Sequence, residues 1–182
     1  VLKHTPGNTV SNLSSSRALK DVTEAYGQQY HAAAVGEVNV VAEMKRTHSV
    51  IGGEGNGGVI YPESHYGRDA LVGVGLFLSH YVAQSKKMTE LKSTYPPYFI
   101  SKNKMTLSPD MDVDKILEGL KERYATEKVT DIDGVKIDFA QGWVHLRKSN
   151  TEPIIRIYSE AKDEAAANQL AEEVIAAAKS TL

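Results

Sequence analysis

The chain has 182 residues, of which 41% are hydrophobic and 24% charged, so it can bury one core or two small ones without disulfides. Its 21 lysines and arginines are balanced by 23 acidic residues, which excludes a bulk electrostatic attraction to nucleic acid or anionic membranes. Cysteine is absent, which excludes disulfides, thiolate catalysis and cysteine-based zinc sites. No apolar run approaches the roughly 20 residues that span a bilayer.

The first residues, 1–6, contain neither an initiator methionine nor the apolar stretch of a signal peptide. We therefore expect a water-soluble part of a longer protein. The absence of cysteine is consistent with a reducing compartment, so we expect a cytoplasmic location.

Residues 1–92 alternate short β-rich runs with amphipathic helical stretches. Strands separated by helices predict βαβ units, and hence an α/β domain with a mixed, mainly parallel sheet and flanking helices. The loops at the carboxyl ends of such strands are where ligands bind. The expected strands are 9–13, 30–35 and 49–51, and the expected helices are 14–26, 36–45 and 69–82.

Between residues 85 and 97 the pattern changes, and the two prolines at 96 and 97 indicate a linker because they cannot continue a helix. The elements that follow predict an α+β domain, with helices on one face of an antiparallel sheet. We therefore divide the chain into domains 1–92 and 97–182. The expected second-domain elements are a strand at 98–107, a helix from 108–109 to 124, a hairpin over 135–146, a strand at 154–158 and a helix from 163 to 178.

A glycine loop, residues 52–58, contains five glycines in seven residues and follows an expected strand. Gly53, Gly55 and Gly58 satisfy the spacing G-x-G-x-x-G, but the dinucleotide fingerprint must open a helix, and here an extended run follows. The loop offers the carboxylate of Glu54 and the amide of Asn56, groups that hydrogen-bond vicinal sugar hydroxyls. A tight turn with incidental polar residues is the competing interpretation.

A basic loop, residues 147–153, concentrates hydrogen-bond donors, and Arg156 follows it on the next expected strand. Arginine forks bind phosphate oxygens two at a time, and short hydroxyl and amide groups satisfy the remaining acceptors. These residues favour a phosphate site over the alternative, a polar hairpin with a surface ion pair such as Lys148 with Glu152. The candidate phosphate ligands are Arg147, Ser149, Asn150, Thr151 and Arg156.

Three other sequence patterns do not indicate a functional site. Asp110, Asp112 and Asp114 do not form a calcium loop, because lysines hold the positions of its glycine and its final glutamate. They are expected in the first turn of a helix, where the helix dipole favours negative charge. The six histidines show no ligand spacing, and Trp143 is expected in the core.

Together, the two loops resemble the carboxyl-terminal half of the α-D-phosphohexomutase superfamily, which includes phosphoglucomutase, phosphomannomutase and phosphoglucosamine mutase. The pattern R-x-S-x-T-E-P-x-x-R at 147–156 resembles the phosphate-binding loop of the family's fourth domain. Glu54-x-Asn56-Gly57 resembles the sugar-recognition loop of the third domain, and V-G-E at 35–37 resembles the segment before it. The resemblance covers essentially the whole chain and implies most of domain three, followed by a TATA-binding-protein-like domain four.

The sequence also departs from the family pattern. Asn56 stands where the family usually has serine, and Gly58 where it has histidine, a variant that resembles the bifunctional phosphoglucomutase/phosphomannomutase and phosphoglucosamine mutase group. Ala34 stands where some members carry a basic residue. The family's phosphoserine loop and its D-G-D-x-D-R metal loop do not occur, so we expect no catalytic or metal-binding residue in this chain, and no mutase activity from it alone.

The resemblance implies an intramolecular phosphotransferase that interconverts hexose 1-phosphate and hexose 6-phosphate through a phosphoserine and a bisphosphate intermediate. Glu54, Asn56 and Gly57 would bind the sugar, and the basic-loop residues would hold the phosphate that does not react. Mg²⁺ would bind in the second domain, which this chain lacks. The implied partners are the hexose phosphate, the hexose bisphosphate and the N-terminal domains of the same protein, with neither nucleic acid nor membrane. The alternative is a stand-alone, non-catalytic sugar-phosphate-binding module.

Overall fold

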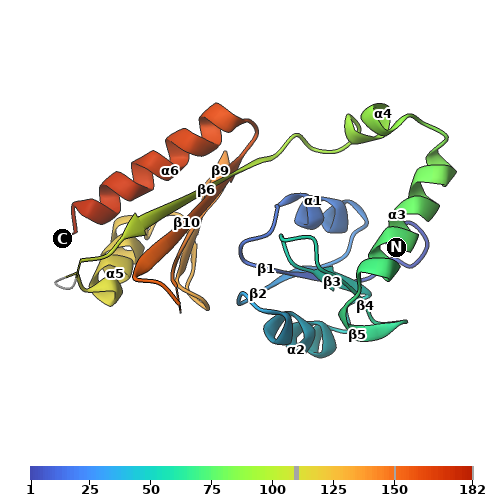
Figure 1. Cartoon of the computed structure of the whole chain (residues 1–182), viewed down its shortest axis with the longest axis horizontal. Coiled ribbons are helices and arrows are strands. Elements are labelled where there is room, and N and C mark those ends of the chain that lie inside the picture. The colour runs from blue at the N-terminus through green and yellow to red at the C-terminus, as the bar shows by residue number, and fades with distance from the viewer. Residues whose placement is uncertain (109–110, 150, 182) are drawn as a thin grey trace. The chain divides into compact units, whose positions relative to one another are not determined.

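The computed structural model describes residues 1–108, 111–149 and 151–181. The chain divides into two compact units, Val1–Pro96 and Pro97–Leu182 (Figure 1).

The first unit is built on a mixed five-stranded sheet with the order β2-β1-β3-β4-β5. β1 pairs in parallel with β2 and with β3, whereas β4 and β5 are added as antiparallel neighbours. The carboxyl ends of the three parallel strands therefore lie at one edge of the sheet. The strands are β1 (Thr9–Asn12), β2 (Tyr30–Ala33), β3 (Ile51–Gly53), β4 (Val59–Tyr61) and β5 (His65–Arg68).

Helices α1 (Ala18–Ala25) and α2 (Glu37–Thr47) cover opposite faces of this sheet (Figure 1). On the α2 face, Val40 and Met44 are fully buried against Val10 and form the apolar core of the unit. On the α1 face, hydroxyl groups join helix to strand, since Thr23 Oγ1 lies 2.7 Å from Thr9 Oγ1. Gly36, with φ of +123°, precedes α2 in a conformation that glycine adopts readily.

Helix α3 (Ala70–Gln84) begins at Asp69, whose carboxylate accepts a hydrogen bond from Val72 N at 2.9 Å. It is strongly apolar, yet none of its side chains is buried; Leu71 is 85% exposed and Val82 73%. In the part of the chain that the structure describes, no helix combines the length and apolarity needed to cross a membrane. The short α4 (Met88–Lys92) follows and buries Leu91.

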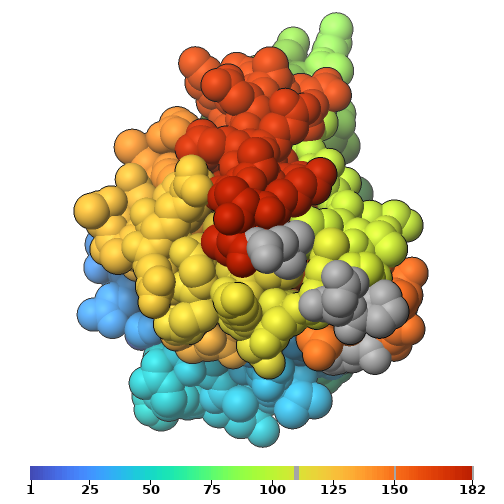
Figure 2. All heavy atoms as spheres, turned by 90° about the vertical axis from the view of Figure 1, so that its left-hand side faces the viewer, coloured from blue at the N-terminus to red at the C-terminus, as the bar shows by residue number. Residues whose placement is uncertain are grey.

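The second unit is an antiparallel five-stranded sheet with the order β6-β10-β9-β8-β7. Two helices, α5 (Val113–Arg123) and α6 (Glu164–Lys179), cover one of its faces, and Figure 2 shows their atoms in front in yellow and red. Side chains alternate along each strand, so Ile155 and Ile157 face the helical core and Arg156 faces the other side. The strands are β6 (Phe99–Thr106), β7 (Lys128–Thr130), β8 (Val135–Asp138), β9 (Gly142–Lys148) and β10 (Ile154–Ala161).

Most expected elements are present, but several differ from expectation. Helix α1 begins at Ala18 rather than at residue 14. The third strand begins at Ile51, two residues later than expected. Strands β5 and β7 were not expected, and α4 lies within the segment assigned to the linker. Helix α5 begins after Asp112, whose carboxylate accepts hydrogen bonds from two backbone N–H groups of the first turn, rather than at 108–109. Residues 109 and 110 lie outside the described part of the chain.

Candidate functional site

The glycine loop connects β3 to β4 at the carboxyl edge of the parallel strands. Its ends are closed by a hydrogen bond from Glu54 N to Gly58 O at 2.9 Å. A Cβ on Gly53 would lie 2.3 Å from that same carbonyl oxygen, so any side chain there would force the backbone of the loop to shift. Gly57 has φ of +96°, a conformation that side chains rarely allow. The geometry of the loop therefore favours glycine at positions 53 and 57.

Glu54 is the most enclosed polar side chain of the loop, with only 5% of its surface exposed. Its Oε1 accepts hydrogen bonds from Asn12 Nδ2 at 3.0 Å and from Gly36 N at 3.2 Å. Its Oε2 lies 3.2 Å from Arg68 Nη1. Four segments of the first unit thus meet at this carboxylate: the ends of β1 and β5, the start of α2 and the glycine loop itself.

Arg68 joins Glu54 to a second carboxylate, and sequence analysis did not identify it. Its Nε donates to Glu37 Oε2 at 2.9 Å, and its backbone N donates to Glu37 Oε1 at 2.9 Å. Both hydrogen bonds lower the pKa of Glu37, and the one from the backbone N of Arg68 has the larger effect. The only sequence signal was an arginine directly before the Asp69 helix cap, within a short polar strand.

Asn56 lies at the exposed tip of the loop. Its Oδ1 accepts a hydrogen bond from Gly58 N at 3.1 Å, which fixes the amide by a local turn. A cavity of about 310 Å³ lies beside the loop, lined by its glycines, by Glu54 and by Ser15 and Ser16 before α1. The sequence analysis did not identify these two serines as candidate site residues.

The basic loop connects β9 to β10 as a hairpin in the second unit. Ser149 N donates to Ile154 O at 3.0 Å, and Thr151 N lies 3.4 Å from Ser149 Oγ. Ser149 is buried, whereas Thr151 is exposed. Asn150, the remaining predicted ligand of this loop, lies outside the described residues.

Two arginines are paired across this hairpin. Arg147 on β9 is the direct cross-strand partner of Arg156 on β10. Arg156 Nη2 donates to Glu152 Oε2 at 2.7 Å, so Glu152 pairs with Arg156 rather than with Lys148. Like charges placed directly opposite each other on a sheet are destabilising, and an anion between them would remove that cost.

The same face of the sheet carries a buried polar cluster next to the arginines. Trp143 is fully buried, its Nε1 donates to Glu160 Oε1 at 2.9 Å, and Lys136 Nζ lies 4.3 Å from the centre of its ring. His145 Nε2 lies 2.7 Å from the carbonyl oxygen of Asp133. Burial lowers the pKa of His145 to about 4, so this histidine is neutral near pH 7.

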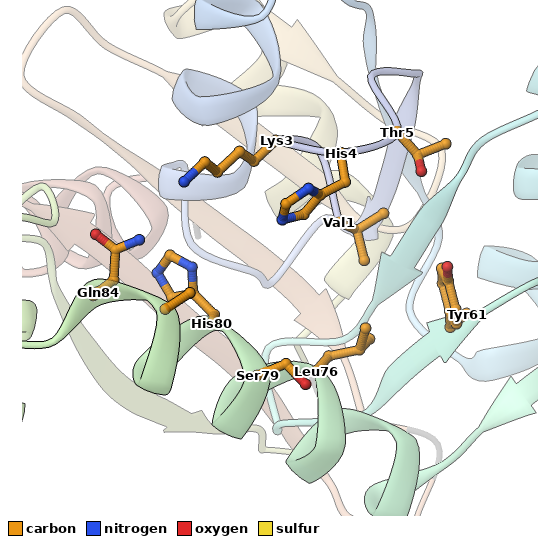
Figure 3. Close-up of a pocket in the computed structure, with 10 residues that line it drawn as sticks. Val1, Lys3, His4, Thr5, Tyr61, Leu76, Ser79, His80 and Gln84 are labelled. Atoms are coloured by element: carbon orange, nitrogen blue, oxygen red, sulfur yellow. The ribbon is translucent and has the colours of Figure 1, made fainter.

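A second hollow of about 180 Å³ in the first unit lies between the N-terminal turn, β4 and helix α3 (Figure 3). Lys3 and His4 line it from the turn, and His80 and Gln84 from the helix. Across the residues that the structure places, no group of three histidine, aspartate or glutamate side chains could hold a metal ion. This hollow therefore lacks the ligand set of a metal site.

Two family descriptions match the chain, one for each compact unit. "Phosphoglucomutase/phosphomannomutase, alpha/beta/alpha domain III" matches residues 1–98, and the C-terminal domain of the same family matches residues 102–177. The chain belongs to the phosphoglucomutase/phosphomannomutase family. The expected family and both expected domain types are thereby confirmed.

Two archaeal members of the family are each 36% identical to this chain. One is a phosphoglucosamine/phosphogalactosamine mutase of Sulfurisphaera tokodaii, and the match covers 91% of this chain and 37% of the relative. The other is a phosphoglucomutase/phosphomannomutase of Thermococcus kodakarensis, with 91% of this chain and 36% of the relative covered. The chain thus spans little more than a third of these relatives.

Solved structures of the family share the fold. A phosphoglucomutase/phosphomannomutase family protein from Burkholderia thailandensis superimposes with a TM-score of 0.79 at 22% identity, covering 99% of this chain and 39% of that one. A phosphomannomutase described as putative, from Thermus thermophilus, gives a TM-score of 0.71 at 26% identity, covering 94% and 36%.

Proposed function

We propose that this chain supplies the sugar-binding and phosphate-binding parts of a phosphohexomutase, which interconverts hexose 1-phosphate and hexose 6-phosphate. The observation that carries the proposal is the cross-strand pair Arg147 and Arg156 beside the Ser149 hydroxyl. Two guanidinium forks can each bind two phosphate oxygens, and Ser149, Thr151 and Asn150 add short donors. These groups would hold the phosphate that does not react.

The glycine loop would hold the hexose. Asn56 is exposed and offers its amide to a hydroxyl group, while Gly57 allows the sugar to approach the backbone closely. Oε1 of Glu54 already accepts two hydrogen bonds, whereas Oε2 is paired, among the described residues, only with Arg68 and can accept a further hydrogen bond from a sugar hydroxyl. The cavity beside the loop supports this assignment because it places a ligand-sized hollow next to these groups.

In the complete protein, a phosphoserine of a preceding domain would transfer its phosphoryl group to the free hydroxyl of the hexose phosphate. The resulting hexose bisphosphate would reorient and return its other phosphoryl group to the serine, so that product and phosphoserine are both regenerated. Mg²⁺ would act at that serine. The described residues of this chain form no metal-ligand cluster, so no step of this chain is assigned to the ion. We place the enzyme in the cytoplasm, as a phosphoprotein.

An amide NMR titration of the chain tests both assignments. The ligands are glucosamine 1-phosphate, glucose 1-phosphate, mannose 1-phosphate and inorganic phosphate. We expect every ligand to shift the signals of the basic loop and only the sugars to shift those of the glycine loop. Arg147→Gln should abolish the phosphate response, whereas Lys162→Gln, which removes an exposed lysine beyond β10, should leave it unchanged. Equal responses of the two variants would contradict the phosphate site.

Activity provides a second test. In a coupled hexose 6-phosphate assay we expect no turnover from this chain alone, because its sequence contains neither the phosphoserine loop nor the metal loop. In a complete protein that includes this chain, Arg147→Gln should lower kcat/KM by about tenfold or more, since charge-assisted hydrogen bonds contribute about 1.5–3 kcal/mol. Turnover by the chain alone at the level of a complete mutase would overturn the division of roles.

A further inference from the structure

Three basic residues lie in register on three neighbouring strands of the second unit. Arg147 on β9 is paired with Arg156 on β10, and Arg156 is paired with Lys104 on β6. Residues in register on neighbouring strands project to the same face, with Cβ atoms about 4.5–5.5 Å apart between adjacent strands. We call these three residues the cation row.

The cation row lies on the face of the sheet away from α5 and α6. Ile155 and Ile157, which flank Arg156 along β10, belong to the core that those helices cover. Lys104 and Arg156 also line one hollow of about 270 Å³, together with Glu152. Lys104 therefore shares a surface depression with a residue of the proposed phosphate site.

The three cationic side chains of the cation row have fewer carboxylate partners than positive charges. Glu152 pairs with Arg156, and among the residues described by the structure neither Lys104 nor Arg147 forms an ion pair with a carboxylate. The chain as a whole has a net charge of −2, so the row is a local excess of positive charge in a slightly acidic protein. Cross-strand like charges are unfavourable, and a bound anion with two negative charges would offset the repulsion.

We propose that Lys104 is a third cationic ligand of the substrate phosphate, contributed by the edge strand β6. This inference rests on the proposed function, because it extends the phosphate site defined by Arg147 and Arg156. The two guanidinium groups fix the orientation of the phosphate by their planar forks, whereas the ammonium group adds a mobile point charge. Lys104 would thus help neutralise the second charge of the phosphate dianion.

Lys102 provides a matched comparison within the same strand. It also lies on β6, faces the same side two residues away and lines the same hollow, but its ammonium group lies 5.5 Å from the centre of the Tyr158 ring. Lysines on edge strands also serve to prevent edge-to-edge aggregation. If that were the only role of Lys104, the two lysines would behave alike in phosphate binding.

The experiment is a titration of the chain with inorganic phosphate and with glucose 1-phosphate, followed by the amide signals of Arg147 and Arg156. We expect Lys104→Gln to raise the Kd for both ligands about fivefold, while Lys104→Arg and Lys102→Gln change it less than twofold. Because Lys104 is exposed, its variants should fold. Without phosphate, Lys104→Gln should unfold at the same temperature as the parent or higher, since one repulsive charge is gone.

Each result is decisive. An equal Kd for Lys104→Gln and the parent, while Arg147→Gln abolishes binding, would overturn the role of Lys104 and leave the proposed phosphate site intact. If Lys104→Gln and Lys102→Gln weaken phosphate binding equally, the effect comes from the overall positive charge of the strand, and the specific role of Lys104 is overturned. Absence of any phosphate response in the parent would overturn both the proposed site and its extension.

Discussion

Replacing Glu54 by glutamine tests whether the negative charge of this carboxylate stabilises the glycine loop. Glu54→Gln retains one oxygen that can accept from Asn12 and Gly36, but it converts these charge-assisted hydrogen bonds to neutral ones and places an amide opposite Arg68. Hydrogen bonds to charged groups contribute about 1 kcal/mol more than neutral ones, and a half-exposed ion pair adds up to about 1 kcal/mol. We therefore expect the free energy of unfolding to fall by about 2–3 kcal/mol.

The assay is native-state hydrogen exchange of the β1 and β3 amides, which reports on the first unit alone. The control is Glu24→Gln, because Glu24 is 57% exposed and its contact with Lys20 is 3.9 Å long. We expect the control to change stability by less than about 0.5 kcal/mol. If Glu54→Gln and Glu24→Gln have the same small effect, the carboxylate does not stabilise the loop and our reasoning is wrong.

Three further results are expected. The folded pKa of His145, about 4, lies below its unfolded value of 6.5, so the unfolded state binds the proton first as pH falls. Urea unfolding followed by tryptophan fluorescence should therefore show a loss of about 2 kcal/mol between pH 7.5 and pH 5, and a variant His145→Gln should not show this loss. Gly53→Ala should destabilise the first unit by about 1–3 kcal/mol and remove the sugar response in NMR, because its Cβ would lie 2.3 Å from a carbonyl oxygen. The control Gly75→Ala, whose Cβ enters open space on α3, should raise stability by up to about 1 kcal/mol in urea titrations. Val82→Glu on exposed α3 should change the free energy of unfolding by less than about 0.5 kcal/mol and should reduce any self-association seen in sedimentation experiments. A large loss of stability would show that this face of α3 is packed.

Sequence patterns predicted the elements that have a strong local signal. Helices were expected to begin at 69 and 163, and Asp69 and Asp163 cap the helices there, because a carboxylate at that position accepts from free N–H groups of the first turn. Trp143 is buried as expected. Strands β5 and β7 were missed because they are short and polar, and are formed by pairing with β4 and β8 rather than by their own composition.

The candidate site was predictable only in part for a related reason. Loop composition identified the residue types that can bind sugar and phosphate, and these assignments remain predictions. Arg68 lies beside Glu54 because β5 pairs antiparallel with β4. The spacing of 14 residues between Glu54 and Arg68 in the sequence does not specify this contact. Likewise, Lys104 comes next to Arg156 only through the register of β6 with β10, two strands separated by about 50 residues.

The anchoring of Glu54 has a consequence for the entropy of the proposed sugar binding. Five glycines in seven residues suggest a loop that would lose much conformational freedom when a ligand orders it, at about 1–2 kcal/mol per residue. Contacts from β1, the start of α2 and β5 already fix the carboxylate, and the bond between Glu54 N and Gly58 O closes the ends of the loop. Hydrogen bonds within the tip, from Gly58 N to Asn56 Oδ1 and from Gly57 N to Glu54 O, leave little of the loop to be ordered, so the proposed sugar would bind with a small loss of conformational entropy.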